Sequence, residues 1–395
     1  MGVGSVGLLV GRAEQLDVLR LLLGRARTGE PQFVLVVGEP GIGKTRLVGE
    51  FVAGVDESVR VLATQCLELA GAEVPLAPVQ ELVHAAFRRW GAEAVREASG
   101  AYLPMLAVLE PALLAPEDAP APGPLANQRQ LFWAVRHLIE QLADAGPLLV
   151  VVEDVHWADE ATLDLLRYLA VALDDVPVLL VATSRTGTSA AEQVLTSTGH
   201  LPRATTLELE ELSPEEAAGL VEVLAGAVTQ PGHPSASALD VQRVVELSGG
   251  NPLYLEELVA AGRSETLPDS LRALLLSRLS GLSEQARYLV DLVSVGDPPV
   301  RYDDLLAATG WPEGRLDDVL AEARAAGVLT VTAVASRVTL RHPLVGDAAR
   351  EDLDPGRRRS LHRAWAVGLS ASSPRSPHTA LMVAHHWDHA AEPGP

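Results

Sequence analysis

The chain has 395 residues, 48% of them hydrophobic, which excludes a disordered protein and is enough for several domains with buried cores. Its 31 basic and 52 acidic residues give a net charge of −21, which repels nucleic acid and anionic membrane surfaces at long range. Cys66 is the single cysteine, and no apolar run reaches the roughly 18 residues that span a bilayer, so we expect a cytoplasmic protein without disulfides or membrane contact.

The first predicted element is an amphipathic helix over residues 13–27, because its leucines recur at helical spacing on one face. These leucines are Leu16, Leu19, Leu22 and Leu23. A short segment with Val10, Gly11 and Arg12 precedes the helix.

The stretch GEPGIGKT fits G-x-x-x-x-G-K-[ST] at every fixed position, between a predicted strand at 33–37 and a predicted helix. Its glycines allow a tight turn whose backbone N–H groups point at one concavity, which suits a di- or triphosphate. Lys44 would neutralise the β- and γ-phosphates, and the Thr45 hydroxyl would ligate Mg²⁺. We therefore predict an ATP or ADP site. Its predicted contact residues here are Gly38, Glu39, Pro40, Gly41, Ile42, Gly43, Lys44, Thr45 and Arg46.

Lys44 is also the only lysine of the chain. All the other basic positions, histidines aside, are arginine. Lysine is kept here because a guanidinium is too wide and planar for a phosphate cradle. The alternative is a glycine-rich turn that binds nothing, and the lone lysine argues against it.

A second strand is predicted at 59–64 and a helix around 79–90. The alanine- and proline-rich stretch 91–124 indicates a surface insertion or loop. A strong helical pattern follows at 127–143.

The run from Leu148 to Asp154 predicts a buried parallel strand that ends in two acids, which is the Walker B pattern. By position Glu153 would hold the Mg²⁺ shell and Asp154 would orient the attacking water. This order reverses the usual Asp-Glu, and the shorter Asp154 reaches the water poorly, so we expect slow hydrolysis. The alternative is a strand that merely ends in solvated acids.

A helix at 160–173 and a strand at 178–183 come next, with Arg185 at the carboxyl end of that strand. Ligands bind at the carboxyl ends of strands in open α/β sheets, so Arg185 is expected to face the γ-phosphate, with a surface arginine as the alternative. A fifth strand at 205–209 completes a five-stranded parallel sheet, and we predict an α/β fold of the P-loop NTPase type.

After residue 212 the apolar period becomes helical. Ser213 and Glu216 predict a capping box at the start of a helix, and a proline-bearing break at 230–235 separates it from a second helix. A Gly-Asn-Pro turn then places Pro252 at the start of a third helix, where it would pack on adenine or ribose. The alternative is an ordinary helix cap.

Several stretches carry a family resemblance: GEPGIGKTRL, VVVEDVHWADEATLDLLRYLA, LLVATSR, LSGGNPLYLEELV and RHPLVGDAA. They resemble the nucleotide-binding region of the signal-transducing ATPases with numerous domains (STAND), in the branch of large ATP-binding LuxR-type (MalT-like) transcriptional regulators of actinobacteria. The segment LVGRAEQL resembles the adenine-covering segment of such ATPases, which gives Val10, Gly11 and Arg12 a nucleotide role; an ordinary packing helix is the alternative.

The resemblance implies an AAA-type core, a helical lid and a winged-helix domain. The implied boundaries are an N-terminal adenine-side segment at 1–30, the P-loop core at 31–211, the lid at 212–263, the winged helix at 264–362, and the start of a helical-repeat arm at 363–395. The family's repeat sensor and DNA-binding domain would follow, so we expect no specific DNA binding by this chain.

Two functions remain open at this stage. One is a regulatory ATP/ADP switch that hydrolyses ATP slowly and self-associates on ATP binding. The other is an active AAA-type ATPase, such as a remodeller or an origin-binding initiator. An initiator needs a basic winged helix, whereas residues 264–362 are nearly charge-balanced, which favours the switch.

Histidines suggest further sites. The resemblance implies that His342 contacts the ADP β-phosphate, and Pro343 predicts that its side chain is presented at the strand end and not buried within a sheet face; packing against the wing is the alternative. His156 is expected to be structural or switch-related. His385 and His386 are adjacent and face different sides of a helix, so no metal site is expected there.

Overall fold

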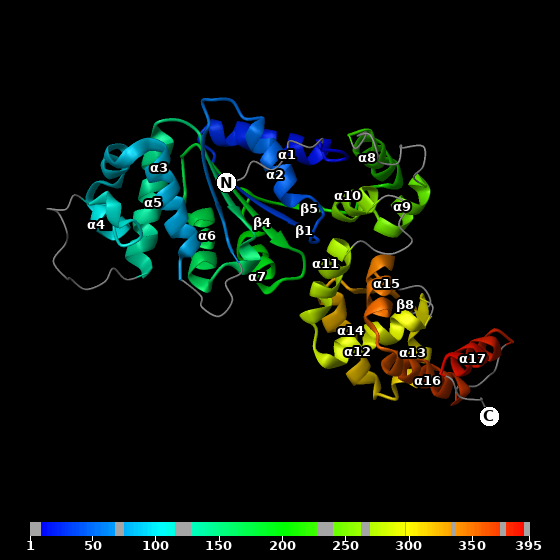
Figure 1. Cartoon of the computed structure of the whole chain (residues 1–395). Coiled ribbons are helices and arrows are strands. Elements are labelled where there is room, and N and C mark those ends of the chain that lie inside the picture. Colours follow the sequence, from blue (N-terminus) through cyan, green and yellow to red (C-terminus); the bar gives the residue numbers. More distant parts are fainter. Residues whose placement is uncertain are drawn as a thin grey trace. The chain divides into compact units, whose positions relative to one another are not determined.

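The computed structural model describes most of the chain, and it divides into two compact units, Met1–Glu210 and Glu211–Pro395 (Figure 1). The described residues are 9–67, 75–114, 128–227, 240–261, 269–296, 298–332, 337–371 and 377–390. The predicted break at 230–235 lies outside them. We consider each unit by itself.

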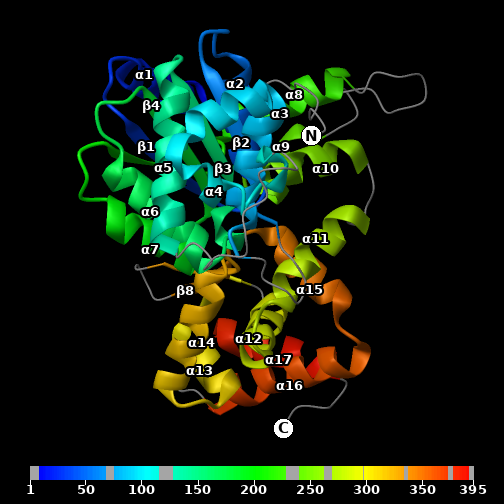
Figure 2. The ribbon, with the colours of Figure 1, turned by 90° about the vertical axis from the view of Figure 1, so that its left-hand side faces the viewer.

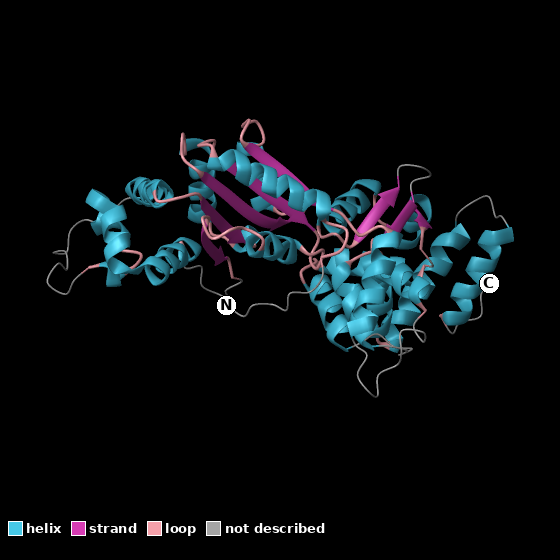
Figure 3. Cartoon of the chain, turned by 90° about the horizontal axis from the view of Figure 1, so that it is seen from above, coloured by secondary structure: helices cyan, strands magenta, loops and turns pink. Residues whose placement is uncertain are grey.

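The first unit is built on a five-stranded parallel sheet, whose strands are magenta in Figure 3. The strand order is β2-β3-β4-β1-β5. The strands are β1 (Gln32–Gly38), β2 (Arg60–Gln65), β3 (Leu148–Glu153), β4 (Val178–Arg185) and β5 (Ala204–Leu209). Strand β1 is buried along its whole length, because β4 and β5 flank it and helices cover both faces. The predicted α/β fold of a P-loop NTPase is thereby confirmed.

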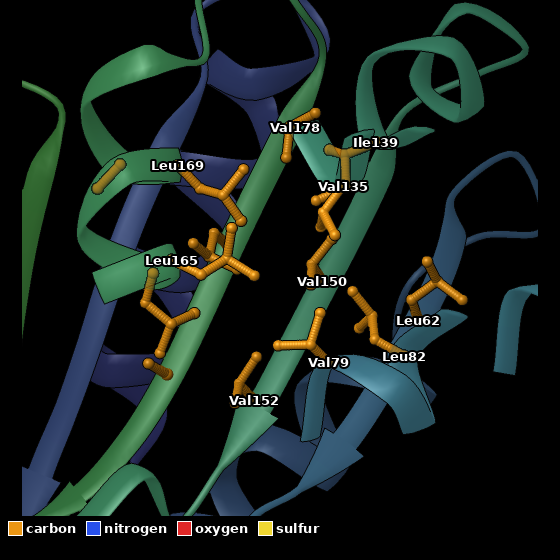
Figure 4. Packing of buried hydrophobic residues seen from close by; sticks show 14 of the residues in the cluster. Leu62, Val79, Leu82, Val135, Ile139, Val150, Val152, Leu165, Leu169 and Val178 are labelled. Carbon is orange, nitrogen blue, oxygen red and sulfur yellow. The ribbon is translucent and has the colours of Figure 1, made fainter. Parts of the chain in front are cut away.

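Side chains alternate between the two faces of the sheet, so each face meets its own helical layer. Val34 and Val36 pack against α1 (Ala13–Arg27) and α2 (Lys44–Ala53). On the opposite face lie α3 (Ala77–Ser99), α5 (Gln128–Asp144), α6 (Glu160–Ala172) and α7 (Ser189–Thr198) (Figure 2). Figure 4 shows side chains of β3, α5 and α6 meeting in this second layer.

The prediction of a surface insertion or loop at 91–124 is wrong for its first part, residues 91–114. The structure continues α3 across a kink at Gly91 and adds η1 (Gly100–Tyr102), α4 (Leu103–Leu106) and η2 (Pro111–Leu113). Val95, Leu106 and Leu113 are buried in the core of the first unit. The apolar side chains that anchor this segment are widely spaced among alanines, which hides their periodicity. Residues 115–124 lie outside the described part.

The second unit is mainly helical. Its helices are α8 (Pro214–Ala227), α9 (Val241–Ser248), α10 (Pro252–Ala261), α11 (Asp269–Ser280), α12 (Glu284–Val295), α13 (Tyr302–Thr309), α14 (Glu313–Ala325), α15 (Pro343–Asp352), α16 (Pro355–Ala371) and α17 (Pro377–His389). A small antiparallel sheet has the order β6-β8-β7, with β6 (Val300–Arg301), β7 (Leu329–Thr332) and β8 (Arg337–Leu340). Trp365 of α16 is fully buried in the core of this unit.

The predicted capping box at the start of α8 is confirmed. Ser213 N–H donates to Glu216 Oε2 at 2.8 Å, and Glu216 N–H donates to Ser213 Oγ at 3.2 Å. Helices α12 to α14 and the hairpin β7–β8 lie within residues 264–362, and the assignment of this region as a winged helix stays a prediction. Within the described residues, no helix combines the length and apolar content that crossing a membrane requires.

Candidate nucleotide-binding site

The P-loop connects β1 to α2 and adopts conformations that need glycine. Gly41 and Gly43 have φ values of 80° and 101°, in the left-handed region that side chains disfavour. At Gly38 a Cβ atom would lie 2.8 Å from Ile42 Cγ2 and 3.0 Å from the Leu209 carbonyl oxygen. Close packing at Gly38 and the left-handed backbone at Gly41 and Gly43 therefore disfavour any residue with a side chain at these positions.

Lys44 begins α2 and folds back over the loop. Its side chain is buried, with 7% of the residue exposed, and Nζ donates to the carbonyl oxygens of Gly38 at 2.8 Å and Glu39 at 2.9 Å. Two carbonyls thus hold the ammonium group within the loop. Because the charge is already positioned, a phosphate entering the loop would not have to order this side chain first.

Arg12 links the segment before α1 to the P-loop. Its guanidinium is buried, and Nη2 donates to the carbonyl of Glu210 at 2.6 Å and, more weakly, to that of Ile42 at 3.5 Å. Val10 and Gly11 precede it and are half-buried. The structure therefore brings the predicted N-terminal residues to the P-loop, with Arg12 in a structural contact.

Glu153 lies at the carboxyl end of β3, beside the P-loop helix. Its carboxylate accepts a hydrogen bond from Thr45, while Oε2 is buried with no hydrogen-bond partner among the described residues. Burial raises the pKa of this carboxyl, and the Thr45 contact opposes that rise. A hydroxyl next to a carboxylate oxygen that still has a vacant acceptor position is a donor set that Mg²⁺ prefers. These residues fit the ion that accompanies a nucleotide.

Asp154 follows in a conformation that is rare for a residue with a side chain, at φ 57°. Its N–H donates to Thr183 Oγ1 of β4 at 2.9 Å, and Gln65 Nε2 of β2 donates to Oδ2 at 3.0 Å. Two neighbouring strands therefore fix the backbone and the carboxylate. The roles of Thr183 and Gln65 were not predicted from the sequence, where only their positions at strand ends could have indicated them.

His156 is buried at the same edge of the sheet, with 4% of its side chain exposed. Within the described residues, neither ring nitrogen has a hydrogen-bond partner, although Nδ1 lies 3.9 Å from Asp154 Oδ1. Burial, followed by the positive charge of Arg185, lowers the pKa of His156 to about 4. The ring is therefore neutral at pH 7 and has polar atoms that the described residues do not satisfy.

Arg185 ends β4 in register with Gly38, the first residue of the P-loop. Its guanidinium carbon lies 5.3 Å from the centroid of the Trp157 ring, within cation–π distance. The backbone register places Arg185 at the edge of the sheet where the P-loop begins, as the sequence predicts. Its contact with the γ-phosphate stays a prediction.

Pro252 and His342 belong to the second unit. Pro252 begins α10, and His342 is extended at φ −121°, as Pro343 predicts. The expectation that the His342 side chain is presented and not buried is wrong, because only 1% of the residue is exposed. Its ring meets that of Tyr254 edge-on at 5.2 Å. The reason is that Pro343 starts α15, a buried helix that the sequence analysis did not predict, and α15 draws His342 inward.

Known proteins support the assignment of the core. Residues 8–181 match the family model described as "AAA ATPase domain". An uncharacterised protein of Rhizobium meliloti (strain 1021) is 29% identical over an alignment of 287 residues that covers 67% of this chain. The chain spans 26% of the length of that relative.

Two solved structures share the fold. The Walker-type ATPase of Pyrococcus abyssi matches with a TM-score of 0.58 at 16% identity, over 87% of this chain and 96% of its own. The ORC2 protein of Aeropyrum pernix, solved as ADPNP–ADP complexes, matches with a TM-score of 0.52 at 13% identity, over 92% and 96%. Together with the P-loop and the parallel sheet, these matches show the fold of a P-loop NTPase, and residues 8–181 are similar to an AAA ATPase domain.

Proposed function

We propose that the chain is the nucleotide-binding module of a STAND-type signal-transduction switch, in a cytoplasmic transcriptional regulator of the LuxR type. It binds ATP or ADP with Mg²⁺ and hydrolyses ATP slowly. The observation that carries the proposal is the hydrogen bond between Thr45 and Glu153 beside a lysine that is already held in the P-loop. That arrangement joins the phosphate cradle to the Walker B strand.

Each residue has a role set by its position. Lys44 and the backbone of the P-loop bind the β- and γ-phosphates, and Arg185 faces the terminal phosphate. Thr45 and Glu153 hold Mg²⁺, which screens the phosphate charge when it is bound. Asp154 orients the attacking water. Val10, Gly11 and Arg12 lie on the adenine side.

Slow turnover follows from how Asp154 is held. One of its carboxylate oxygens already accepts from Gln65, and its backbone is fixed by Thr183, so the short side chain has little freedom to reach a water. The neutral His156 beside it supplies no positive charge to the transition state. Both features favour holding a nucleotide over turning it over.

The proposal also covers the second unit, with a helical lid at 212–263, a winged helix at 264–362 and the start of a repeat arm after it. His342 packs against Tyr254, and a Cβ at Gly249 would lie 3.0 Å from His342 Nδ1. Both neighbours flank the turn that leads into Pro252. His342 therefore supports that turn, through which it would favour bound ADP.

The first test is calorimetric titration of the full chain with ATP and Mg²⁺. We expect Lys44→Ala to weaken binding at least about 100-fold, because hydrogen bonds to charged groups are individually strong. Arg20→Ala, which removes an exposed charge on α1, is the matched control and should bind like the wild type. Wild-type affinity in a folded Lys44→Ala protein would contradict the site.

The second test separates a switch from a motor. Nucleotide released on denaturation of the purified protein should include ADP, and steady-state phosphate release should be below about 1 s⁻¹. An empty site with faster turnover would instead favour the alternative, an active AAA-type remodeller or initiator. Light scattering with and without ATP tests the proposed self-association.

A further inference from the structure

Four histidines gather between α16 and α17, far from the nucleotide motifs in the sequence. His362 comes from α16, and His385, His386 and His389 come from α17, which packs beside it (Figure 1). Ligand atoms of His362, His385 and His386 all lie within 4.8 Å of one another. The His389 ring stacks on that of His362 at 5.0 Å and lies 4.2 Å from that of His385.

The closest pair is His362 and His386, whose Nδ1 atoms are 2.9 Å apart. Both residues are buried, and the His386 ring stacks on that of Trp365, a core residue, at 5.8 Å. Tetrahedral zinc with Zn–N bonds of about 2.0–2.1 Å places its ligand atoms about 3.4 Å apart. The pair therefore needs only a small opening to hold one ion.

His385 completes the set of three ligand atoms, and His389 lies beside it. His385 and His389 are four residues apart and lie on one side of α17, the spacing with which two helical histidines bind one metal. His389 Nδ1 lies 2.9 Å from the carbonyl oxygen of His385, so it donates there and keeps Nε2 as its metal-ligating atom. Exposure of these two rings leaves the cluster open to an ion from solvent.

The side chains of the cluster select the kind of ion. Four imidazoles with no carboxylate among them suit a borderline transition metal such as Zn²⁺ better than Mg²⁺ or Ca²⁺.

We propose that His362, His385, His386 and His389 bind one divalent transition metal ion of the zinc class, which fastens α17 to α16. The expectation from the sequence was no metal site at His385 and His386, because adjacent helical residues diverge. What the sequence could not show is that α16 brings His362 into contact with both of them. The site is independent of the nucleotide.

The test uses the untagged full chain after dialysis against a chelator. Titration with Zn²⁺ should show one tight site per chain, and Co²⁺ should give the absorption bands of a tetrahedral complex. Zn²⁺ should also raise the melting temperature. His385→Ala and His389→Ala change exposed residues, so both should fold, and each should weaken Zn²⁺ binding at least about tenfold.

His200→Ala is the matched control, because His200 is an exposed histidine in the first unit. It should bind Zn²⁺ like the wild type. The proposal is overturned if the wild type binds no Zn²⁺ at stoichiometric concentration, or if folded His385→Ala and His389→Ala bind it unchanged. It is also overturned if His200→Ala loses as much affinity as they do, since that would mean scattered surface binding.

Discussion

Two buried histidines, one in each unit, have opposite surroundings. His156 lies at the carboxyl edge of the parallel sheet among charged groups, close to Asp154, Arg185 and Lys44. His342 lies against the ring of Tyr254 and the backbone of Gly249. Burial alone therefore does not mark a functional histidine.

The two rings differ in the charged groups that surround them. Around His156, polar atoms of Glu153 and of the histidine itself have no hydrogen-bond partner among the described residues. Such atoms are costly in a folded chain unless a ligand or water meets them. Around His342 the contacts include an aromatic ring and the backbone of a turn. The first unit places its buried histidine among charged groups of the candidate site, and the second places its own against a turn between two helices.

The largest effect is expected from a substitution that removes packing around His342. Tyr254 is fully buried, and Tyr254→Ala should lower the free energy of unfolding by about 3 kcal/mol, because it removes a large buried ring and leaves a cavity. Urea unfolding of the full chain measures this. Tyr254→Phe keeps the ring and should cost less than about 1.5 kcal/mol. Equal losses in the two variants would mean that the hydroxyl, and not the ring, supports His342.

The second prediction tests the role of Asp154 at the carboxyl edge of the sheet. Asp154→Asn should lower ATP turnover at least about tenfold and leave nucleotide affinity unchanged, because an amide orients a water less well than a carboxylate does. Single-turnover phosphate release measures it. Asp174→Asn, at an exposed aspartate of the same unit, is the control. Unchanged turnover in Asp154→Asn would remove Asp154 from the mechanism.

The core of the first unit and its P-loop were predictable, because they depend on local patterns. Gly38, Lys44 and Glu153 stand in motifs of fixed spacing beside apolar strands. Gln65 and His362 were not predictable, because each acts on a residue that only tertiary packing brings close. The inward turn of His342 was missed for the same reason, since α15 decides it and Pro343 alone does not.

A third prediction tests the turn beside His342. Gly249 ends α9 with φ 58°, and a Cβ there would lie 3.0 Å from His342 Nδ1. Gly249→Ala should therefore lower the free energy of unfolding by about 1 kcal/mol, through backbone strain and a tight contact. Gly310→Ala is a matched control, because Gly310 ends α13 with φ 64° and has open space around its Cβ position. A larger loss at Gly249 than at Gly310 measures the contribution of His342.

The fourth prediction asks whether His156 is retained for stability or for function. Replacing it by leucine removes two polar ring atoms that the described residues leave without hydrogen-bond partners, so His156→Leu should leave the unfolding free energy at pH 7 unchanged or raise it by up to about 1 kcal/mol. A loss of several kcal/mol would show that the ring is a structural contact, like that of His342.

The pH dependence of the unfolding free energy also tests the role of His156, because the pKa of the ring sets the direction of the change. The pKa of His156 is about 4 in the folded chain, against its ordinary value of about 6.5, so between these pH values the unfolded chain binds a proton that the folded chain does not. The wild type should therefore lose stability relative to His156→Leu as the pH falls from about 6.5 towards 4, and the two should run parallel above pH 7. Parallel curves over the whole range would mean that His156 takes up its proton in the folded state, where Asp154 is the nearest anion to hold it. The ring would then carry a positive charge at the nucleotide edge below about pH 6.5.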